Sequence, residues 1–537
     1  MIKWTRLWPL AIFLIGGALT LWLQIYSRNG VLFSGDAGLK ALLAQQLAGG
    51  NFSFDLQLSV DPWVESLWRQ GLYPFTPPFV YAQGSKHFIT FPFTFPAVTA
   101  PFYALLGYRG LYVAPLAGLW LIWGRFYQIC RRLSLSPLVT TISLTAVVLG
   151  SPLLLYGGMY WEHTLAVALA FWGATLVLFP KSMTPTVREL AIGGMLMGLA
   201  VWFRPEFLCL IAALGIVASL GELAPQWLGG FRLGFLKTVV LIGSMAGAVL
   251  TFFALNFLVY GHPLGIHAIQ IVEESSLAQQ LAQAKDNSIK LLTSLFRYFP
   301  MAGLAIAAPL MAHFKADFKL PASAKALLIV GLFYAASVPM IVPPGAGGKQ
   351  WGPRFYLILI PLAVLVIAQQ LEVLIKYRPI TRWFSLGIFA LLLTIGIHAN
   401  AIQGGVREYS HPQTQSVSLA QNYGPIAPMV KATTAQPLPW IAMSHQFVAQ
   451  QLWSSLPDKT FFLTETPETL KQLGAALLLQ GESAFLYVCY PHRPCPIPEL
   501  EPEALQLTSG DHLIQMKFNS LGTFGKYPTY EVVLQPS

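Results

Sequence analysis

Long apolar stretches separated by short polar segments recur along residues 8–400 of the chain. Most are close to the roughly 20 residues that an α-helix needs to cross the hydrocarbon core of a bilayer. The pattern predicts about eleven membrane-spanning helices, at 8–26, 111–129, 137–156, 164–180, 189–203, 207–221, 237–259, 298–313, 325–342, 355–371 and 383–399. We therefore expect a polytopic α-helical membrane protein.

The segment 27–110 departs from this pattern. Its aromatic and proline content predicts a structured first external loop. Near its end, Phe91 to Gly107 is apolar but contains Pro92, Pro96 and Pro101, which would interrupt a spanning helix. We expect this stretch to lie at the outer membrane interface instead of crossing.

The pattern changes again after Ala399, where charges, glycines and prolines return. Short β-type runs at 460–464, 484–489 and 529–534 predict strands, and 467–480 predicts a helix. The chain is thus expected to have a transmembrane domain, 1–400, and a C-terminal extracytoplasmic α/β domain, 401–537.

Composition supports a membrane setting. The 537 residues are 55% hydrophobic and 10% charged, whereas soluble domains carry about 25% charged residues. With the N-terminus inside, 15 of the 33 Lys and Arg residues fall in short cytoplasmic segments, 11 in external segments and 7 in the tail. The bias predicts a cytoplasmic N-terminus and an extracytoplasmic C-terminus. It also accounts for most of the net charge of +10, so we expect no nucleic-acid partner.

Four cysteines add one open question. Cys130 and Cys209 belong to apolar stretches and are expected to be packing residues. Cys489 and Cys495 flank a proline-rich turn in the tail, and they could form a disulfide if the tail is exported.

Asp36 lies just beyond the first apolar stretch, in Ser34-Gly-Asp-Ala-Gly-Leu-Lys40. A carboxylate there can accept a proton from an attacking hydroxyl or amine. Alternatively, Asp36 could only cap the helix expected at 37–48, since Asp is a favoured N-cap. Lys40, one turn later, could neutralise a phosphate or pair with Asp36.

Two further segments carry charge at the ends of apolar stretches. In Tyr160-Trp-Glu-His163, the pair Glu162 and His163 could orient an acceptor or bind a metal, or Glu162 could simply suit a helix N-terminus with Trp161 at the interface. In Phe203-Arg-Pro-Glu206, Arg204 could clamp a phosphate, or pair locally with Glu206 to shape a helical hairpin.

A glycine-rich segment precedes the tenth apolar stretch, Gly345-Ala-Gly-Gly-Lys-Gln-Trp-Gly-Pro-Arg-Phe-Tyr356. Its glycines permit close approach of the backbone, and Lys349 and Arg354 supply two cations. It is not a phosphate-binding P-loop, because the Gly-x-x-x-x-Gly-Lys-Ser/Thr spacing is absent. Alternatively, Arg354 could be an ordinary interfacial anchor.

Together with the topology, these segments resemble the GT-C glycosyltransferases, polyprenyl-phosphate-sugar-dependent membrane enzymes that include protein O-mannosyltransferases and aminoarabinose transferases. Bacterial glycosyltransferase-like proteins with a Gly-Asp-x-Gly-x-Lys element are similar in Gly35 to Lys40. The resemblance covers residues 8–400 and not the tail. It implies a GT-C-like fold in a bacterial inner or plasma membrane and inverting sugar transfer on the extracytoplasmic side.

The resemblance also implies roles for individual residues. Asp36 and Glu162 would be catalytic; the substrate-binding residues would be Lys40, His163, Arg204, Glu206, Lys349 and Arg354. The acceptor could be a lipid, a glycan or a protein, and a divalent metal, Mg²⁺ or Mn²⁺, could assist. The alternatives are a transporter or flippase for a lipid-linked or anionic solute, and an inactive scaffold. Transporters tend to place charges in mid-span, whereas these lie at one membrane face.

Overall fold

The computed structural model describes residues 7–25, 30–58, 60–182, 184–223, 232–266, 276–307, 321–343, 345, 347–377, 379–493, 495, 506–509 and 512–536. The chain forms two compact units. The membrane unit comprises Met1–Tyr26 and Tyr112–Ala420, and the loop–tail unit comprises Ser27–Leu111 and Gln421–Ser537. The division predicted from the sequence, at residue 400, differs from this one, because it includes the first external loop in the transmembrane domain.

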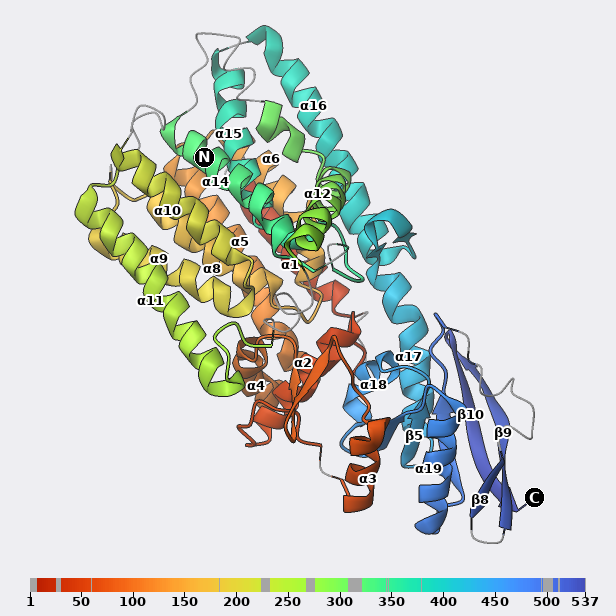
Figure 1. The fold of residues 1–537 in the computed structure, drawn as a ribbon. Helices are drawn as coiled ribbons and strands as arrows, with labels where there is room; N and C mark the ends of the chain where they lie inside the picture. The colour runs from red at the N-terminus through yellow and green to blue at the C-terminus, as the bar shows by residue number, and fades with distance from the viewer. Residues whose placement is uncertain are drawn as a thin grey trace. The chain divides into compact units, whose positions relative to one another are not determined.

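The membrane unit is helical (Figure 1). Its helices are α1 (Trp8–Leu23), α5 (Val113–Arg132), α6 (Pro137–Val148), α7 (Leu153–Tyr156), α8 (His163–Leu178), α9 (Val187–Phe203), α10 (Phe207–Leu223), α11 (Phe235–Tyr260), α12 (Leu277–Tyr298), α14 (Ala322–Ser337), α15 (Leu359–Tyr377) and α16 (Pro379–Ile397).

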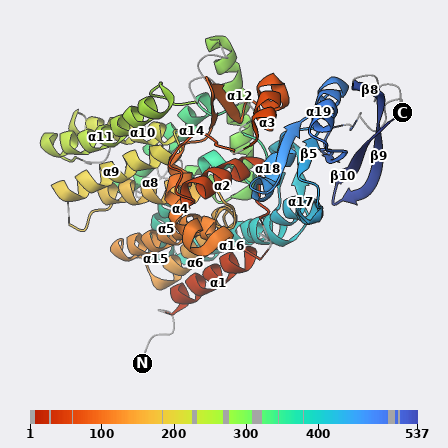
Figure 2. The ribbon, with the colours of Figure 1, turned by 90° about the horizontal axis from the view of Figure 1, so that it is seen from below.

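Small residues let helices of this unit approach closely. A Cβ at Gly193 of α9 would lie 3.0 Å from the carbonyl oxygen of Gly173 in α8, and one at Gly198 would lie 3.0 Å from that of Met245 in α11. Helices α8, α9 and α11 accordingly lie side by side in both views (Figures 1 and 2). Such contacts between small residues are typical of packed transmembrane helices.

Within the described residues, five stretches are long and apolar enough to cross a membrane. They are Thr94–Arg132, Phe235–Tyr260, Ala322–Met340, Leu359–Lys376 and Arg382–Val406. Large apolar side chains also point outward, as Leu250 and Leu258 of α11 do. The polytopic helical prediction agrees with these features; the count of eleven spans stays a prediction, and the span at 298–313 lies partly outside the described residues.

The loop–tail unit contains a six-stranded sheet in the order β6-β5-β7-β10-β9-β8. Strands β5, β6 and β7 are parallel, and β10 joins β7 and β9 in antiparallel fashion. The strands are β5 (Trp440–Met443), β6 (Thr460–Leu463), β7 (Ala484–Val488), β8 (Gln506–Ser509), β9 (His512–Phe524) and β10 (Tyr527–Pro536). The helices of the tail are α17 (Leu419–Ala435), which begins before the unit does, α18 (Phe447–Gln451) and α19 (Pro467–Leu479). The strands and the helix predicted from the sequence are confirmed.

The first external loop is structured, as predicted. It forms α2 (Gly35–Ala48), α3 (Pro62–Leu67), β1 (Val80–Gln83), β2 (Lys86–Ile89) and α4 (Thr94–Leu106). Its aromatic side chains pack on the tail: the indole of Trp68 donates to the carbonyl of Phe461 at 3.0 Å, and Trp63 meets Trp440 with ring centroids 5.1 Å apart. The loop and the tail therefore share one core.

The 91–107 stretch contains a short helix in spite of its prolines, and its place at the outer membrane interface stays a prediction. Helix α4 runs continuously through Pro96 and Pro101. Pro96 lies in the first turn, where its missing N–H has no intrahelical partner to lose. At 13 residues, α4 alone is shorter than a membrane span.

Candidate active site

A buried ion-pair cluster joins the end of α9 to the start of α8. Arg204 follows α9 and donates from Nε to Oε1 of Glu206 at 2.7 Å and from Nη1 to Oε1 of Glu162 at 3.0 Å. Glu162 directly precedes α8 and its side chain is 1% exposed, against 14% for Arg204. The structure thus brings together three residues that the sequence singled out.

A second guanidinium joins this cluster through an aromatic ring. Cζ of Arg204 lies 5.0 Å from the ring centroid of Phe355, and Cζ of Arg354 lies 4.9 Å from it. Arg354 is also 5.4 Å from the ring of Trp161. Guanidinium groups within about 6 Å of an aromatic ring are attracted by its quadrupole. Both guanidinium groups therefore contact the ring of Phe355.

The segment that carries Arg354 is anchored by a buried indole. Trp351 is fully buried and donates from Nε1 to Oδ1 of Asn400 at 3.1 Å. The amide nitrogen of Asn400 donates in turn to three main-chain carbonyls, those of Gly150, Tyr298 and Gly396. These contacts tie the glycine-rich segment to three other parts of the membrane unit.

Gly347 leaves room for the guanidinium of Arg354. Its φ is +84°, and a Cβ built on it would overlap Nη2 of Arg354. The sequence predicted that glycines here would permit close approach of the backbone. In the structure, the group that approaches is a side chain of the chain itself.

The remaining predicted residues of the membrane unit differ in their placement. His163 is buried, and its ring centroid lies 5.1 Å from that of Trp161 and 5.4 Å from that of Tyr156. His163 thus borders the cluster through Trp161, which also contacts Arg354. Lys349 is exposed on the glycine-rich segment.

Asp36 and Lys40 belong to the loop–tail unit. Asp36 lies in the first turn of α2, and its carboxylate is 4.0 Å from Nζ of Lys40. Lys40 is buried, and its Nζ lies 4.3 Å from the ring centroid of Phe91. The carboxylate of Asp36, with 15% of its side chain exposed, is the more accessible partner.

The glycines of the Gly-Asp-x-Gly-x-Lys element have a packing role. A Cβ at Gly38 would overlap the carbonyl oxygen of Gln450 in α18, and a Cβ at Gly35 would overlap the side chain of the same residue. The first turn of helix α2 therefore lies directly against α18.

Metal binding finds little support in these groups. Among the residues that the structure describes, no group of three or more His, Cys, Asp and Glu side chains could hold a metal ion. Glu162 and Glu206 are both engaged by Arg204 and do not fit a cation as they stand. The metal stays a prediction.

Of the simpler interpretations of these residues, one is confirmed in part and two are wrong. The local pair of Arg204 with Glu206 exists, but it is one half of a larger cluster. The interpretation of Asp36 as an N-cap is wrong, because Ser34 occupies that position. Trp161 is fully buried and is therefore not an interfacial side chain.

The sequence did not reveal the aromatic part of the site. Phe355 directly follows Arg354, and Trp161 directly precedes Glu162, so adjacency to a candidate charge was the available signal. Tyr156 had no such signal. It is buried, and its ring centroid lies 5.6 Å from that of Trp161 and 5.4 Å from that of His163.

The fold is that of the GT-C glycosyltransferases. The chain matches the crystal structure of apo ArnT from Cupriavidus metallidurans with a TM-score of 0.52 at 12% identity, over 96% of this chain and 97% of that chain. ArnT bound to undecaprenyl phosphate matches with a TM-score of 0.50 at 11% identity, over the same shares of the two chains. The predicted resemblance to the GT-C class is confirmed at the level of the fold, which includes a polytopic helical membrane part and a C-terminal domain.

A second similar structure is the oligosaccharyltransferase of Archaeoglobus fulgidus, in complex with Zn and sulfate. It matches with a TM-score of 0.51 at 12% identity, over 90% of this chain and 68% of that chain. No protein-family model and no curated protein matches the sequence.

Proposed function

We propose that the chain is a membrane glycosyltransferase that takes a sugar from a polyprenyl-phosphate-linked donor and transfers it on the extracytoplasmic side. The GT-C fold supports the class of reaction. The complex of ArnT with undecaprenyl phosphate supports the class of donor. The acceptor is a lipid, a glycan or a protein.

The observation that carries this proposal is the pair of guanidinium groups on Phe355. Arg204 uses Nε and Nη1 for two carboxylates, and its Nη2 has no hydrogen-bond partner among the described residues. A guanidinium held rigidly with a spare N–H suits a phosphate oxygen, since charge-assisted bonds of this kind are short and strong. Arg354 would add a second cation to the same phosphate.

The carboxylates of the cluster then have a positioning role. Glu162 and Glu206 hold the guanidinium plane of Arg204 through two bonds to different nitrogens. The sequence suggested a catalytic role for Glu162, but its contact with Arg204 favours orientation of the phosphate-binding group. His163 would support Trp161, and Lys349 would attract the charged head of the donor from the exposed end of its segment.

Asp36 would act on the acceptor. The acceptor oxygen or nitrogen attacks the anomeric carbon, and the bond from that carbon to the phosphate oxygen breaks. The phosphate keeps the electron pair, and the acceptor proton passes to the carboxylate of Asp36. One direct displacement inverts the anomeric configuration. Lys40, 4.0 Å away, would orient the carboxylate.

Two features of the chain support the proposed location. The Lys and Arg bias favours an extracytoplasmic C-terminus. The disulfide between Cys489 and Cys495 in the tail agrees with an oxidising compartment.

A transfer assay tests the proposal. The purified chain would be placed in liposomes with polyprenyl-phosphate-linked sugars and the glycolipids of a bacterial lipid extract, and the donors followed by mass spectrometry. We expect release of polyprenyl phosphate that depends on Asp36. Donors that cross the bilayer without being consumed would instead support a flippase.

A further inference from the structure

The sheet of the loop–tail unit has a topological switch point between β5 and β7. From β5 the chain passes through α18 to β6 on one side, then through α19 to β7 on the other side of β5. The three parallel strands end level, since Met443 is in register with Leu463 of β6 and with Val488 of β7. In open α/β sheets, ligands bind outside the carboxyl ends of the strands at such a point.

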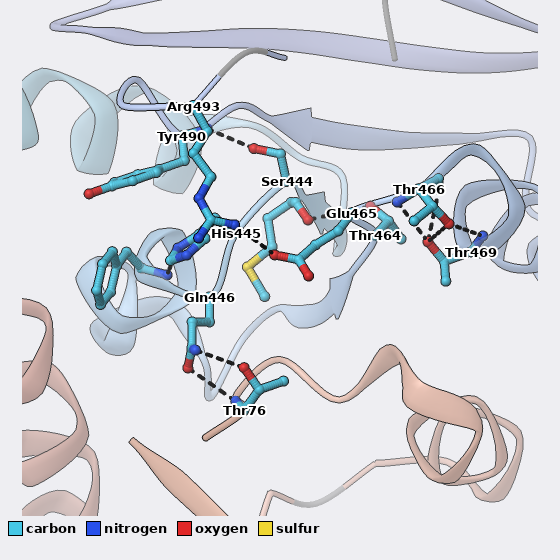
Figure 3. A network of polar contacts seen from close by, with 12 residues as sticks. Thr76, Ser444, His445, Gln446, Thr464, Glu465, Thr466, Thr469, Tyr490 and Arg493 are labelled. Carbon is cyan, nitrogen blue, oxygen red and sulfur yellow. Dashed lines mark hydrogen bonds and ion pairs between the residues drawn. The ribbon is translucent and has the colours of Figure 1, made fainter. Parts of the chain in front are cut away.

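His445 lies two residues beyond the end of β5, and its ring offers a hydrogen-bond donor that is unpaired among the described residues. His445 is 8% exposed, and its ring stacks on the ring of Tyr490, which follows β7. The two ring centroids are 4.8 Å apart (Figure 3). Nδ1 accepts a hydrogen bond from the backbone N–H of Phe447 at 3.2 Å. Nε2 therefore carries the proton in the neutral ring, and it has no partner among the described residues.

Arg493, in the loop after β7, and Glu465, in the loop after β6, add two charged side chains to this edge of the sheet. Nη1 of Arg493 lies 3.8 Å from Oε1 of Glu465, which follows β6 (Figure 3). Their side chains are 62% and 48% exposed, so both remain accessible. Burial and the charge of Arg493 lower the pKa of His445 to about 4, which keeps its ring neutral near pH 7.

The loop after β7 is held in place by a covalent link. The disulfide between Cys489 and Cys495 closes the segment that carries Tyr490 and Arg493. The backbone N–H of Tyr490 also donates to Oγ of Ser444, the residue after β5, at 2.8 Å. A loop fixed in this way loses little conformational freedom when a ligand binds.

We infer that the carboxyl edge of β5, β6 and β7 binds a saccharide, through His445, Glu465 and Arg493. The edge offers neutral and cationic N–H donors beside a carboxylate acceptor. Sugar hydroxyls both donate and accept, so one diol can satisfy both kinds of group. An isolated phosphate or carboxylate would meet the charge of Glu465, and among the described residues of this group a metal ion would find a single carboxylate. The inference rests on the proposed function in one respect, that the saccharide belongs to the glycosyl acceptor.

Saturation-transfer NMR on the full chain in nanodiscs tests this inference without donor or turnover. The probes are soluble dextran, β-glucan, chitin and lipopolysaccharide-core oligosaccharides. We expect at least one to bind, with an affinity at least tenfold lower in Arg493→Gln and in Glu465→Gln. Arg69→Gln is the matched control, because Arg69 forms an exposed ion pair with Glu65 at 2.9 Å in the same unit. The Arg69→Gln variant should bind the saccharide as tightly as the wild type does.

Two results would overturn the saccharide site. One is that none of the four probes binds; the other is that binding is unchanged in both Arg493→Gln and Glu465→Gln. Asp36→Asn separates the inference from the proposed function, since it should abolish transfer and leave saccharide binding intact. If the chain binds a saccharide but transfers no sugar, the proposed glycosyltransferase activity is refuted and the saccharide site is retained.

Discussion

Gly347 and Arg354 occupy adjoining space in the membrane unit, and a side chain at position 347 would take the place of the Arg354 guanidinium. The positive φ of Gly347 adds a second constraint, because other residues adopt that conformation at a cost. This glycine is therefore as much a part of the cation site as the arginine itself.

Gly347→Ala should weaken donor binding as Arg354→Ala does, because the added methyl displaces Nη2 of Arg354. Gly348→Ala is the control: among the described residues its Cβ would meet nothing within 4 Å, and its φ is not positive. Undecaprenyl phosphate affinity of both variants can be measured by microscale thermophoresis in detergent. Equal affinity in the two variants would show that Arg354 does not contact the phosphate.

Arg204→Ala should destabilise the fold as well as weaken donor binding. It leaves the carboxylates of Glu162 and Glu206 buried without their cation, and breaking a buried pair costs about 3–5 kcal/mol. Arg232→Ala removes an exposed partner of Glu222 and should cost at most about 1 kcal/mol. SDS-induced unfolding in mixed micelles compares the two, and a similar small cost for both would mean that water reaches the cluster.

Asp36→Asn should lower the transfer rate by roughly 10²–10⁴, the typical loss for a general base. The amide keeps the size of the side chain but cannot take up the acceptor proton, and Ser34 still occupies the N-cap of α2. Asp61→Asn, an exposed change just before α3 in the same unit, should leave the rate unchanged. A rate near that of the wild type in Asp36→Asn would remove Asp36 from the mechanism.

These residues also mark how far the sequence can be interpreted. Asp36 and Lys40 are one helical turn apart, and Arg204 and Glu206 are two residues apart, so their pairs were predictable from local spacing. The bond from Arg204 to Glu162 joins residues 42 positions apart. It depends on how the end of α9 meets the start of α8, which no local pattern specifies.

The division of the chain into two units also depends on contacts between residues far apart in the sequence. Trp68 and Phe461 are 393 residues apart, and their hydrogen bond belongs to the core that the first loop shares with the tail. An aromatic loop and a β-rich tail were each predictable from composition. Their association depends on long-range packing, for which neither segment carries a signal.

A periplasmic reporter fused after Ser537 should be active, and a cytoplasmic reporter at the same place inactive. The Lys and Arg residues concentrated in alternate short segments predict this orientation. Fusions after Tyr377, in a segment predicted to be cytoplasmic, should give the opposite pattern. A cytoplasmic signal from the C-terminus would invert the assignment and place Asp36 on the wrong side for an exported acceptor.

The affinity of the purified chain for undecaprenyl phosphate, compared among the wild type, Arg354→Lys and Arg354→Ala, tests the lipid-phosphate site most directly. Loss of a charge-assisted bond of about 1.5–3 kcal/mol corresponds to roughly 10- to 150-fold weaker binding in Arg354→Ala. Arg354→Lys should fall between, since lysine keeps the charge without the planar fork. Undecaprenol, which lacks the phosphate, should bind all three proteins equally. Equal affinity of all three for undecaprenyl phosphate would contradict the account.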